Sequence, residues 1–189
     1  MDDIILIGYG GHGKSVADCI ERGHEYNIVG YTDLQQHDSV YNYLGTDSVL
    51  EEIFVKGIKN AAVGIGYMGK GDLRERLYIR LKKLGYNLPV ISDPSSIVSP
   101  TAKIDEGTFI GKGAIINADA VVEKMSIINT KALVEHECIV REYSHIAVGA
   151  VLCGQVTVGK ACFIGANATV IQGRKIESDT IVPAGAVVR

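Results

Sequence analysis

Aliphatic residues recur at every sixth position through the second half of the chain, from residue 98 to residue 188, without a gap. A small residue follows four places after almost every one of them, and only Arg174 is large at that place. The aliphatic series is Val98, Ile104, Ile110, Ile116, Val122, Ile128, Val134, Val140, Ile146, Leu152, Val158, Ile164, Val170, Ile176, Val182 and Val188.

A period of six matches neither the 3.6-residue turn of an α-helix nor the two-residue alternation of a half-buried strand. It matches a solenoid whose coils have three short flat sides, with one inward aliphatic residue on each side. Three hexads then make one coil, and the stretch from residue 98 to residue 188 leaves room for five coils. The pattern therefore predicts a parallel β-solenoid over residues 97–189.

The first half of the chain alternates short apolar runs with amphipathic segments, which is typical of a small parallel α/β sheet. A segment at 92–96 should join this first domain, residues 1–93, to the solenoid domain, residues 97–189. The polar, Tyr-rich stretch at 38–45 fits no predicted element. We predict strands at 4–7, 27–31, 61–65 and 88–91, and helices at 14–22, 47–56 and 73–84.

A glycine-rich loop, Gly8-Tyr9-Gly10-Gly11-His12-Gly13, follows the first predicted strand directly. Bare backbone N–H groups at a helix start bind phosphate. The G-x-G-x-x-G spacing, with the acidic Asp33 about 20 residues further on, is also that of dinucleotide-binding proteins. The first half of the chain makes only half of a dinucleotide fold, so a nucleotide-sugar is favoured here. NAD and a tight turn without a ligand stay open as alternatives.

Composition narrows the possible partners. The net charge is −3 and neither half carries a dense basic run, which argues against nucleic acid and against a charged membrane surface. No apolar run has transmembrane length and no signal peptide is recognisable, so we expect a cytoplasmic protein without membrane insertion. The four cysteines lack metal-ligand spacing; Cys138 and Cys162 occupy small-residue places, so we expect buried thiols and no metal site.

His136 is the candidate for chemistry in the solenoid. Stacking coil on coil places it between Ala118 and Gly154, which leaves room for a substrate, and Glu137 is adjacent. Histidine suits proton removal at neutral pH, and a neighbouring carboxylate can fix its tautomer.

Two columns of outward residues are largely apolar, where a solvated face would be polar. We expect both columns to pack against other subunits in a closed ring, with His145 as a polar break in the first. The columns are Phe109, Ile127, His145, Phe163 and Ile181, and Ile115, Leu133, Val151, Thr169 and Val187.

Four stretches, taken in order, carry a resemblance to a known family: the glycine loop, Asn129-Thr130, Glu135-His136-Glu137-Cys138, and the stretch from Tyr143 to Gly149. Together they resemble the bacterial sugar acetyltransferases with hexapeptide repeats. These are the UDP-4-amino-sugar N-acetyltransferases and the related sialic-acid O-acetyltransferases. The resemblance covers nearly the whole chain. It implies a Rossmann-like nucleotide-sugar-binding half, a left-handed β-helix, and a homotrimer with its active site between neighbouring β-helices.

The resemblance also assigns roles to residues. It implies that His136 is the general base, that Glu137 raises its basicity and that Asn129 is an active-site polar group. Leu34 departs from the family, where many relatives have a second Asp. For acetyl-CoA the matching residues are His145, Ala166 and Ala184; for the nucleotide-sugar they are Gly10, Gly11, His12, Thr32, Asp33 and Gly66.

The expected reaction moves acetyl from acetyl-CoA to the amino group of a UDP-linked 4-amino-sugar by direct attack. The runner-up is O-acetylation of sialic acid or another sugar hydroxyl, because His and Glu serve both chemistries. Two further alternatives stay open: a non-catalytic, nucleotide-binding trimeric module, and a zinc enzyme with histidine ligands between subunits. A dehydrogenase is disfavoured because the second half-fold is missing.

Overall fold

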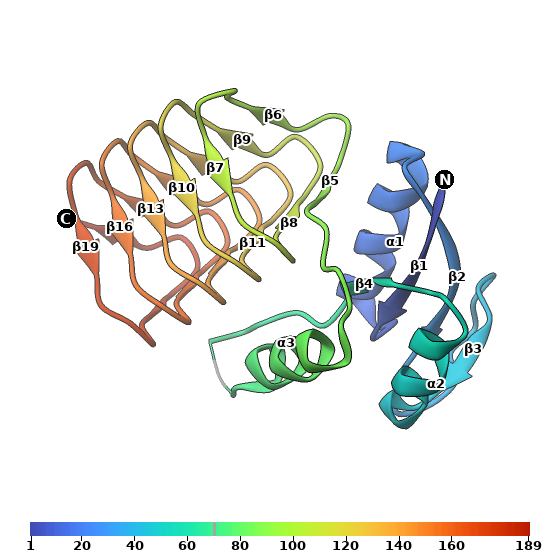
Figure 1. Cartoon of the computed structure of the whole chain (residues 1–189). Coiled ribbons are helices and arrows are strands. Elements are labelled where there is room, and N and C mark those ends of the chain that lie inside the picture. Colours follow the sequence, from blue (N-terminus) through green and yellow to red (C-terminus); the bar gives the residue numbers. More distant parts are fainter. Residues whose placement is uncertain (70) are drawn as a thin grey trace.

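The N-terminal half is a four-stranded parallel sheet with helices packed around it (Figure 1). The computed structural model describes residues 1–69 and 71–189. The sequence also predicts a loop at 66–71, and residue 70 of that loop lies outside the described residues. The strand order β3-β2-β1-β4 places β1 at the centre. The elements are β1 (Asp2–Ile7), α1 (Gly11–Gly23), β2 (Tyr26–Thr32), β3 (Tyr43–Gly45), the 3-10 turn η1 (Asp47–Val49), α2 (Leu50–Val55), β4 (Asn60–Val63) and α3 (Leu73–Leu84).

The fourth strand of this sheet is β3, in the stretch that fitted no predicted element. Tyr43 pairs with Tyr31, and their rings lie 5.5 Å apart, so the tyrosines pack along the sheet edge. The strand predicted at 88–91 is wrong. Asn87 makes only an isolated bridge to Asn60, and Ile91 pairs with Phe109 of the solenoid.

The second half is a parallel β-solenoid of about five turns, and it matches the left-handed β-helix of hexapeptide-repeat proteins. Each strand is short and pairs with the strands one coil before and one coil after it; Ile127, His145 and Phe163, for example, lie in one row. The first sheet consists of β5 (Ile91–Ser92), β8 (Phe109–Ile110), β11 (Ile127–Ile128), β14 (His145–Ile146), β17 (Phe163–Ile164) and β20 (Ile181–Val182). The second consists of β6 (Ile97–Val98), β9 (Ile115–Ile116), β12 (Leu133–Val134), β15 (Val151–Leu152), β18 (Thr169–Val170) and β21 (Val187–Val188). The third consists of β7 (Lys103–Ile104), β10 (Val121–Val122), β13 (Ile139–Val140), β16 (Thr157–Val158) and β19 (Lys175–Ile176).

We call these sides the β14 side, the β15 side and the β16 side. The division at residues 93–97 stays a prediction, although the ladder of the β14 side already includes Ile91 and Ser92. No helix among residues 1–69 and 71–189 is long and apolar enough to span a membrane.

The sixfold pattern is explained by the core. The second residue of every strand from Ile110 to Val182 is at most 5% exposed. Many corners turn through a left-handed residue, Glu137 with φ +57° and Tyr143 with φ +60° among them. The small residue that follows, such as Cys138, is buried inside the corner. The predicted buried cysteines are confirmed at Cys138 and Cys162, both 0% exposed.

The expectation that both apolar columns face other subunits is wrong for the first three residues of the first column. The N-terminal half of the same chain covers the β14 side, so Phe109, Ile127 and His145 are 4%, 0% and 6% exposed. Phe109 and Ile127 share one apolar cluster with Tyr9 and Tyr67. The second column, on the β15 side, is half-exposed from Ile115 to Thr169, and Val187 is exposed.

An inward and an outward residue of the solenoid should differ sharply in their contribution to stability. Leu152→Ala empties a fully buried position and should lower the free energy of unfolding by about 2–5 kcal/mol. Thr157→Ala, at an outward position of β16, should change it by about 0.5 kcal/mol or less. Urea unfolding of both variants measures the difference. Equal losses would contradict the inward assignment.

Candidate active site

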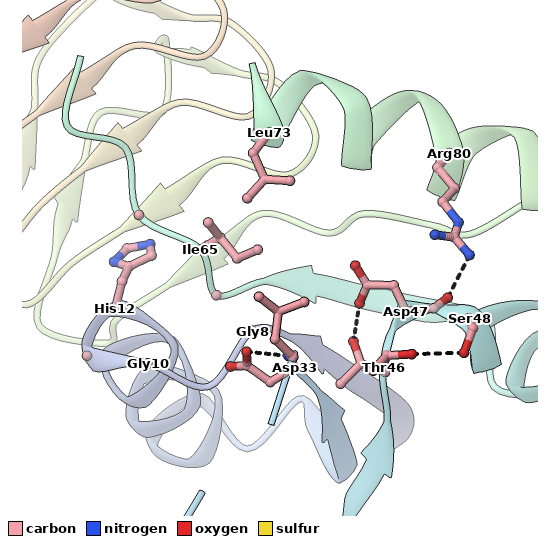
Figure 2. Close-up of a pocket in the computed structure, with 15 residues that line it drawn as sticks. Gly8, Gly10, His12, Asp33, Thr46, Asp47, Ser48, Ile65, Leu73 and Arg80 are labelled. Atoms are coloured by element: carbon pink, nitrogen blue, oxygen red, sulfur yellow. Dashed lines mark hydrogen bonds between the residues drawn. The ribbon is translucent and has the colours of Figure 1, made fainter. Parts of the chain in front are cut away.

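A cavity of about 620 Å³ lies at the carboxyl ends of β1, β2 and β4, where parallel sheets bind ligands. Figure 2 shows the glycine loop and Ile65 on one wall and Leu73 and Arg80 of α3 on the opposite wall. The six residues predicted for the nucleotide-sugar, Gly10, Gly11, His12, Thr32, Asp33 and Gly66, all line it. Sequence reasoning missed Thr46, Asp47, Ser48, Gly64, Ile65, Leu73 and Arg80.

The glycine loop is wound into the start of α1, which begins at Gly11 rather than at the predicted residue 14. The first N–H groups of a helix have no partner inside the helix, so this end offers donors to an anion. Glycine is required at 13 and 64 by close packing. A Cβ on Gly13 would stand 2.4 Å from the carbonyl oxygen of Gly8, and one on Gly64 only 2.3 Å from the same atom.

The polar groups of the cavity hold one another in place. Burial alone would raise the pKa of Asp33, but hydrogen bonds from the backbone N–H groups of Tyr9 and Leu34 and from His37 lower it. Thr32 donates its hydroxyl hydrogen to Asp47 (2.7 Å), and Arg80 donates to the carbonyl oxygen of Asp47 (2.7 Å; Figure 2). The carboxylate of Asp33 is therefore charged and fixed at the end of β2.

His12 lies where the cavity meets the solenoid. Its ring packs edge-on against Phe109, with centroids 5.0 Å apart, and its Nε2 is buried without a partner among the described residues. Burial, and then the nearby charge of Arg74, lowers the pKa of His12 to about 3. Arg74 itself is 3% exposed and donates to the carbonyl oxygens of Ile65 (2.5 Å) and Met125 (2.7 Å), so it joins the cavity wall to the solenoid.

His136 and Glu137 stand on a corner of the solenoid, after β12. The Nδ1 of His136 lies 3.2 Å from Oε2 of Glu137, and both side chains are about half-exposed. Gln155 donates to the same carboxylate oxygen (3.1 Å). The imidazole lies over Gly154, where a Cβ would stand 2.5 Å from Nε2. The carboxylate thus orients the ring through Nδ1, and the other ring nitrogen, Nε2, faces Gly154.

The other predicted solenoid residues lie elsewhere. Asn129 is on the preceding corner, after β11. The same corner of later coils carries Ala166 and Ala184, and the carbonyl oxygen of Ala166 accepts a hydrogen bond from the N–H of Gly185. The β15 side of the solenoid, which includes β12, separates these residues from His136. His145 is 6% exposed on the β14 side, with both ring nitrogens hydrogen-bonded inside the chain.

Comparison with known proteins shows the family to which the chain belongs. The PglD N-terminal domain family matches residues 3–81, and the hexapeptide repeat of succinyl-transferase matches residues 155–189. A mutant of GDP-perosamine N-acetyl transferase from Caulobacter crescentus, solved with CoA and GDP-perosamine, is 31% identical with a TM-score of 0.90, over 100% of this chain and 89% of that chain.

The acetyltransferase domain of PglB from Neisseria gonorrhoeae FA1090 is 30% identical with a TM-score of 0.93, over 100% of this chain and 92% of that chain. Its complex with acetyl coenzyme A is 29% identical with a TM-score of 0.89, over 98% of this chain and 92% of that chain. The chain belongs to the bacterial sugar acetyltransferases with hexapeptide repeats.

The buried, neutral His12 makes stability depend on pH. Between pH 6.5 and its folded pKa of about 3 the folded state keeps this imidazole neutral while the unfolded state binds a proton, so stability is lost as pH falls below 6.5. His12→Gln should therefore reduce the slope of unfolding free energy against pH, between about pH 4.5 and 5.5, by about 1.4 kcal/mol per pH unit. Urea unfolding across pH 4.5–8 measures it. Parallel curves for the variant and the wild type would contradict the prediction.

Proposed function

We propose that the protein transfers acetyl from acetyl-CoA to the amino group of a UDP-linked 4-amino-sugar. The observation that carries the proposal is the His136–Glu137 pair, with Nδ1 held by the carboxylate at 3.2 Å and Nε2 next to the bare backbone of Gly154. The cavity at the start of α1 supports a nucleotide-diphosphate substrate, because helix N-termini stabilise phosphate charge.

In the proposed reaction the sugar amine attacks the thioester carbonyl carbon directly. A C–N bond forms, the C–S bond breaks, and CoA leaves as its thiol after gaining a proton. His136 Nε2 takes the proton that the attacking nitrogen loses, and the Glu137 carboxylate stabilises the imidazolium that results. Asn129 stands near the carbonyl oxygen in this scheme, where an amide N–H can stabilise developing negative charge.

The proposed site is assembled between chains. Asn129, Ala166 and Ala184 share one corner and His136 stands on the next, so one chain cannot place them around the same thioester. A second copy of the chain, with its Asn129 corner beside the His136 corner of the first copy, completes this set of residues. The half-exposed apolar column of the β15 side supports such contact, since it lies between the two corners. A closed homotrimer satisfies every copy equally.

We propose uridine rather than guanosine as the nucleoside of the substrate because the sequence resembles UDP-4-amino-sugar N-acetyltransferases. The similar Caulobacter enzyme was solved with GDP-perosamine, so GDP-linked amino sugars belong in the same test. An amine is favoured over a hydroxyl as the acceptor group because the similar Caulobacter protein is an N-acetyl transferase. O-acetylation of sialic acid remains the alternative, because the His136–Glu137 pair can deprotonate an alcohol as well.

Removal of the base should abolish most of the activity. His136→Ala should lower turnover about 10²–10⁴-fold, because it removes the imidazole that takes the proton in the proposed reaction. The measurement is thiol release from acetyl-CoA with a panel of UDP- and GDP-linked 4-amino-sugars and with sialic acid. His24→Asn, an exposed histidine at the end of α1, is the matched control. A loss below about tenfold on the best acceptor would refute the role of His136.

A methyl group beside His136 should reproduce much of that loss without removing the base. Gly154→Ala places a Cβ where it would meet Nε2 at 2.5 Å, so the imidazole must move away. A displacement of about 1 Å can cost roughly 10²-fold in rate, and KM for the nucleotide-sugar should change little because the cavity is elsewhere. Gly23→Ala, whose added methyl meets nothing within 4 Å, is the control. Full activity in Gly154→Ala would contradict the proposed ring position.

A further inference from the structure

A chain of hydrogen bonds runs from the loop after the nucleotide cavity, through His145, to Asn129. Nδ1 of His145 lies 2.6 Å from the carbonyl oxygen of Tyr67, the residue after Gly66 of the cavity wall. Nε2 of His145 lies 3.0 Å from Nδ2 of Asn129. The imidazole is 6% exposed and packs edge-on against Phe163, with centroids 5.2 Å apart.

The direction of each bond follows from its partners. A carbonyl oxygen only accepts, so Nδ1 of His145 carries the hydrogen and donates to Tyr67. Burial lowers the pKa of His145 to about 4, so the ring is neutral at pH 7 and Nε2 has a lone pair. Oδ1 of Asn129 accepts from the N–H of Thr130 (2.8 Å), which leaves Nδ2 to donate to His145.

The histidine is therefore occupied on both nitrogens, whereas the sequence resemblance places it at the acetyl-CoA thioester. Tyr67 is itself held at a second point, since its hydroxyl donates to the carbonyl oxygen of Ala161 (2.7 Å). An imidazole locked between Tyr67 and Asn129 acts on its surroundings by orienting Asn129. Of the two hydrogens on Nδ2 of Asn129, His145 takes one, and the second is free to point out of the corner.

We propose that His145 is a positioning residue: it fixes the Asn129 amide so that the remaining N–H faces the thioester oxygen, and Tyr67 fixes His145. The inference rests on the proposed function, in which Asn129 stands at the acetyl-transfer site. It adds that the nucleotide-binding half sets the geometry of the transfer site through the Tyr67 backbone.

A double-mutant cycle on turnover tests whether His145 acts through Asn129. Asn129→Ala should lower kcat about 10²–10³-fold, as the loss of an oxyanion donor does, with little change in KM for the nucleotide-sugar. His145→Phe should lower kcat by no more than Asn129→Ala, and should add less than about threefold in the Asn129→Ala background. Losses that multiply in the double variant would show that His145 acts on the substrates directly and would overturn the proposal.

Two conservative variants separate the two bonds and guard against a folding defect. Gln at 145 can place an oxygen near Nε2 and accept from Asn129, whereas Asn at 145 can keep the donor to Tyr67 but cannot reach Asn129. His145→Gln should therefore retain at least about tenfold more kcat than His145→Asn at matched thermal stability. The reverse order would overturn the proposal.

A spectroscopic measurement tests the hydrogen-bond direction without reference to activity. In the wild-type protein labelled with ¹⁵N-histidine, one imidazole should be the neutral Nδ1–H tautomer at pH 7 and keep it to about pH 5, and its signal should be missing from His145→Gln. An Nε2–H tautomer or an imidazolium at His145 would overturn the proposal. A wild type that acetylates no acceptor of the panel would refute the proposed function instead, while this measurement still decides the bond pattern.

Discussion

The stacking of one aliphatic side chain on the next, coil after coil, is the constraint on which the molecule depends. The strands of the solenoid are short, and backbone hydrogen bonds join each coil to the next. The buried column favours one register for these bonds, because a slip by one residue would turn an aliphatic residue outward at every coil. That register lines up outward residues with equal strictness, so Ile127, His145 and Phe163 share a row. The proposed site residues His136 and Asn129 lie at the corners, where the backbone turns and side chains leave the core.

Buried polar side chains, which need hydrogen-bond partners, hold the N-terminal half on the solenoid. Arg74 is buried, yet its contacts are the carbonyl oxygens of Ile65 and Met125 rather than a carboxylate. Removing such a charge from water is costly, and Nε of Arg74 has no partner among the described residues, so its two bonds to carbonyl oxygens carry the compensation. The bond to Met125 exists only when the two halves are docked. Tyr67 adds a bond to Ala161 and a second to His145. The cavity wall and the β14 side therefore form one unit.

The sequence was most informative where a pattern is local. The hexads predicted the solenoid and its core, because the inward period is independent of the rest of the chain. They misplaced the first apolar column, since periodicity tells which residues point outward but not what covers them. The edge strand at Tyr43 was missed because its aromatic, polar stretch shows no alternation. In the cavity, the glycine loop, Asp33 and Gly66 were predictable because each follows a predicted strand. Thr46, Asp47 and Ser48 were missed because they follow the unpredicted strand β3, and Leu73 and Arg80 were missed because they come from a helix, α3.

The geometry of the corners bears on why such a solenoid should assemble. The β15 side is bounded along one edge by the corner of Asn129 and along the other by the corner of His136. Its outward column is largely apolar and half-exposed, unlike Phe109, Ile127 and His145 of the β14 side, which the chain itself covers. A second copy packed on this column would remove apolar surface from water and would lie beside an edge that carries proposed site residues. In the proposed trimer the contact that stabilises the assembly would also enclose the proposed reacting groups, so the proposal assigns catalysis and oligomerisation to one surface.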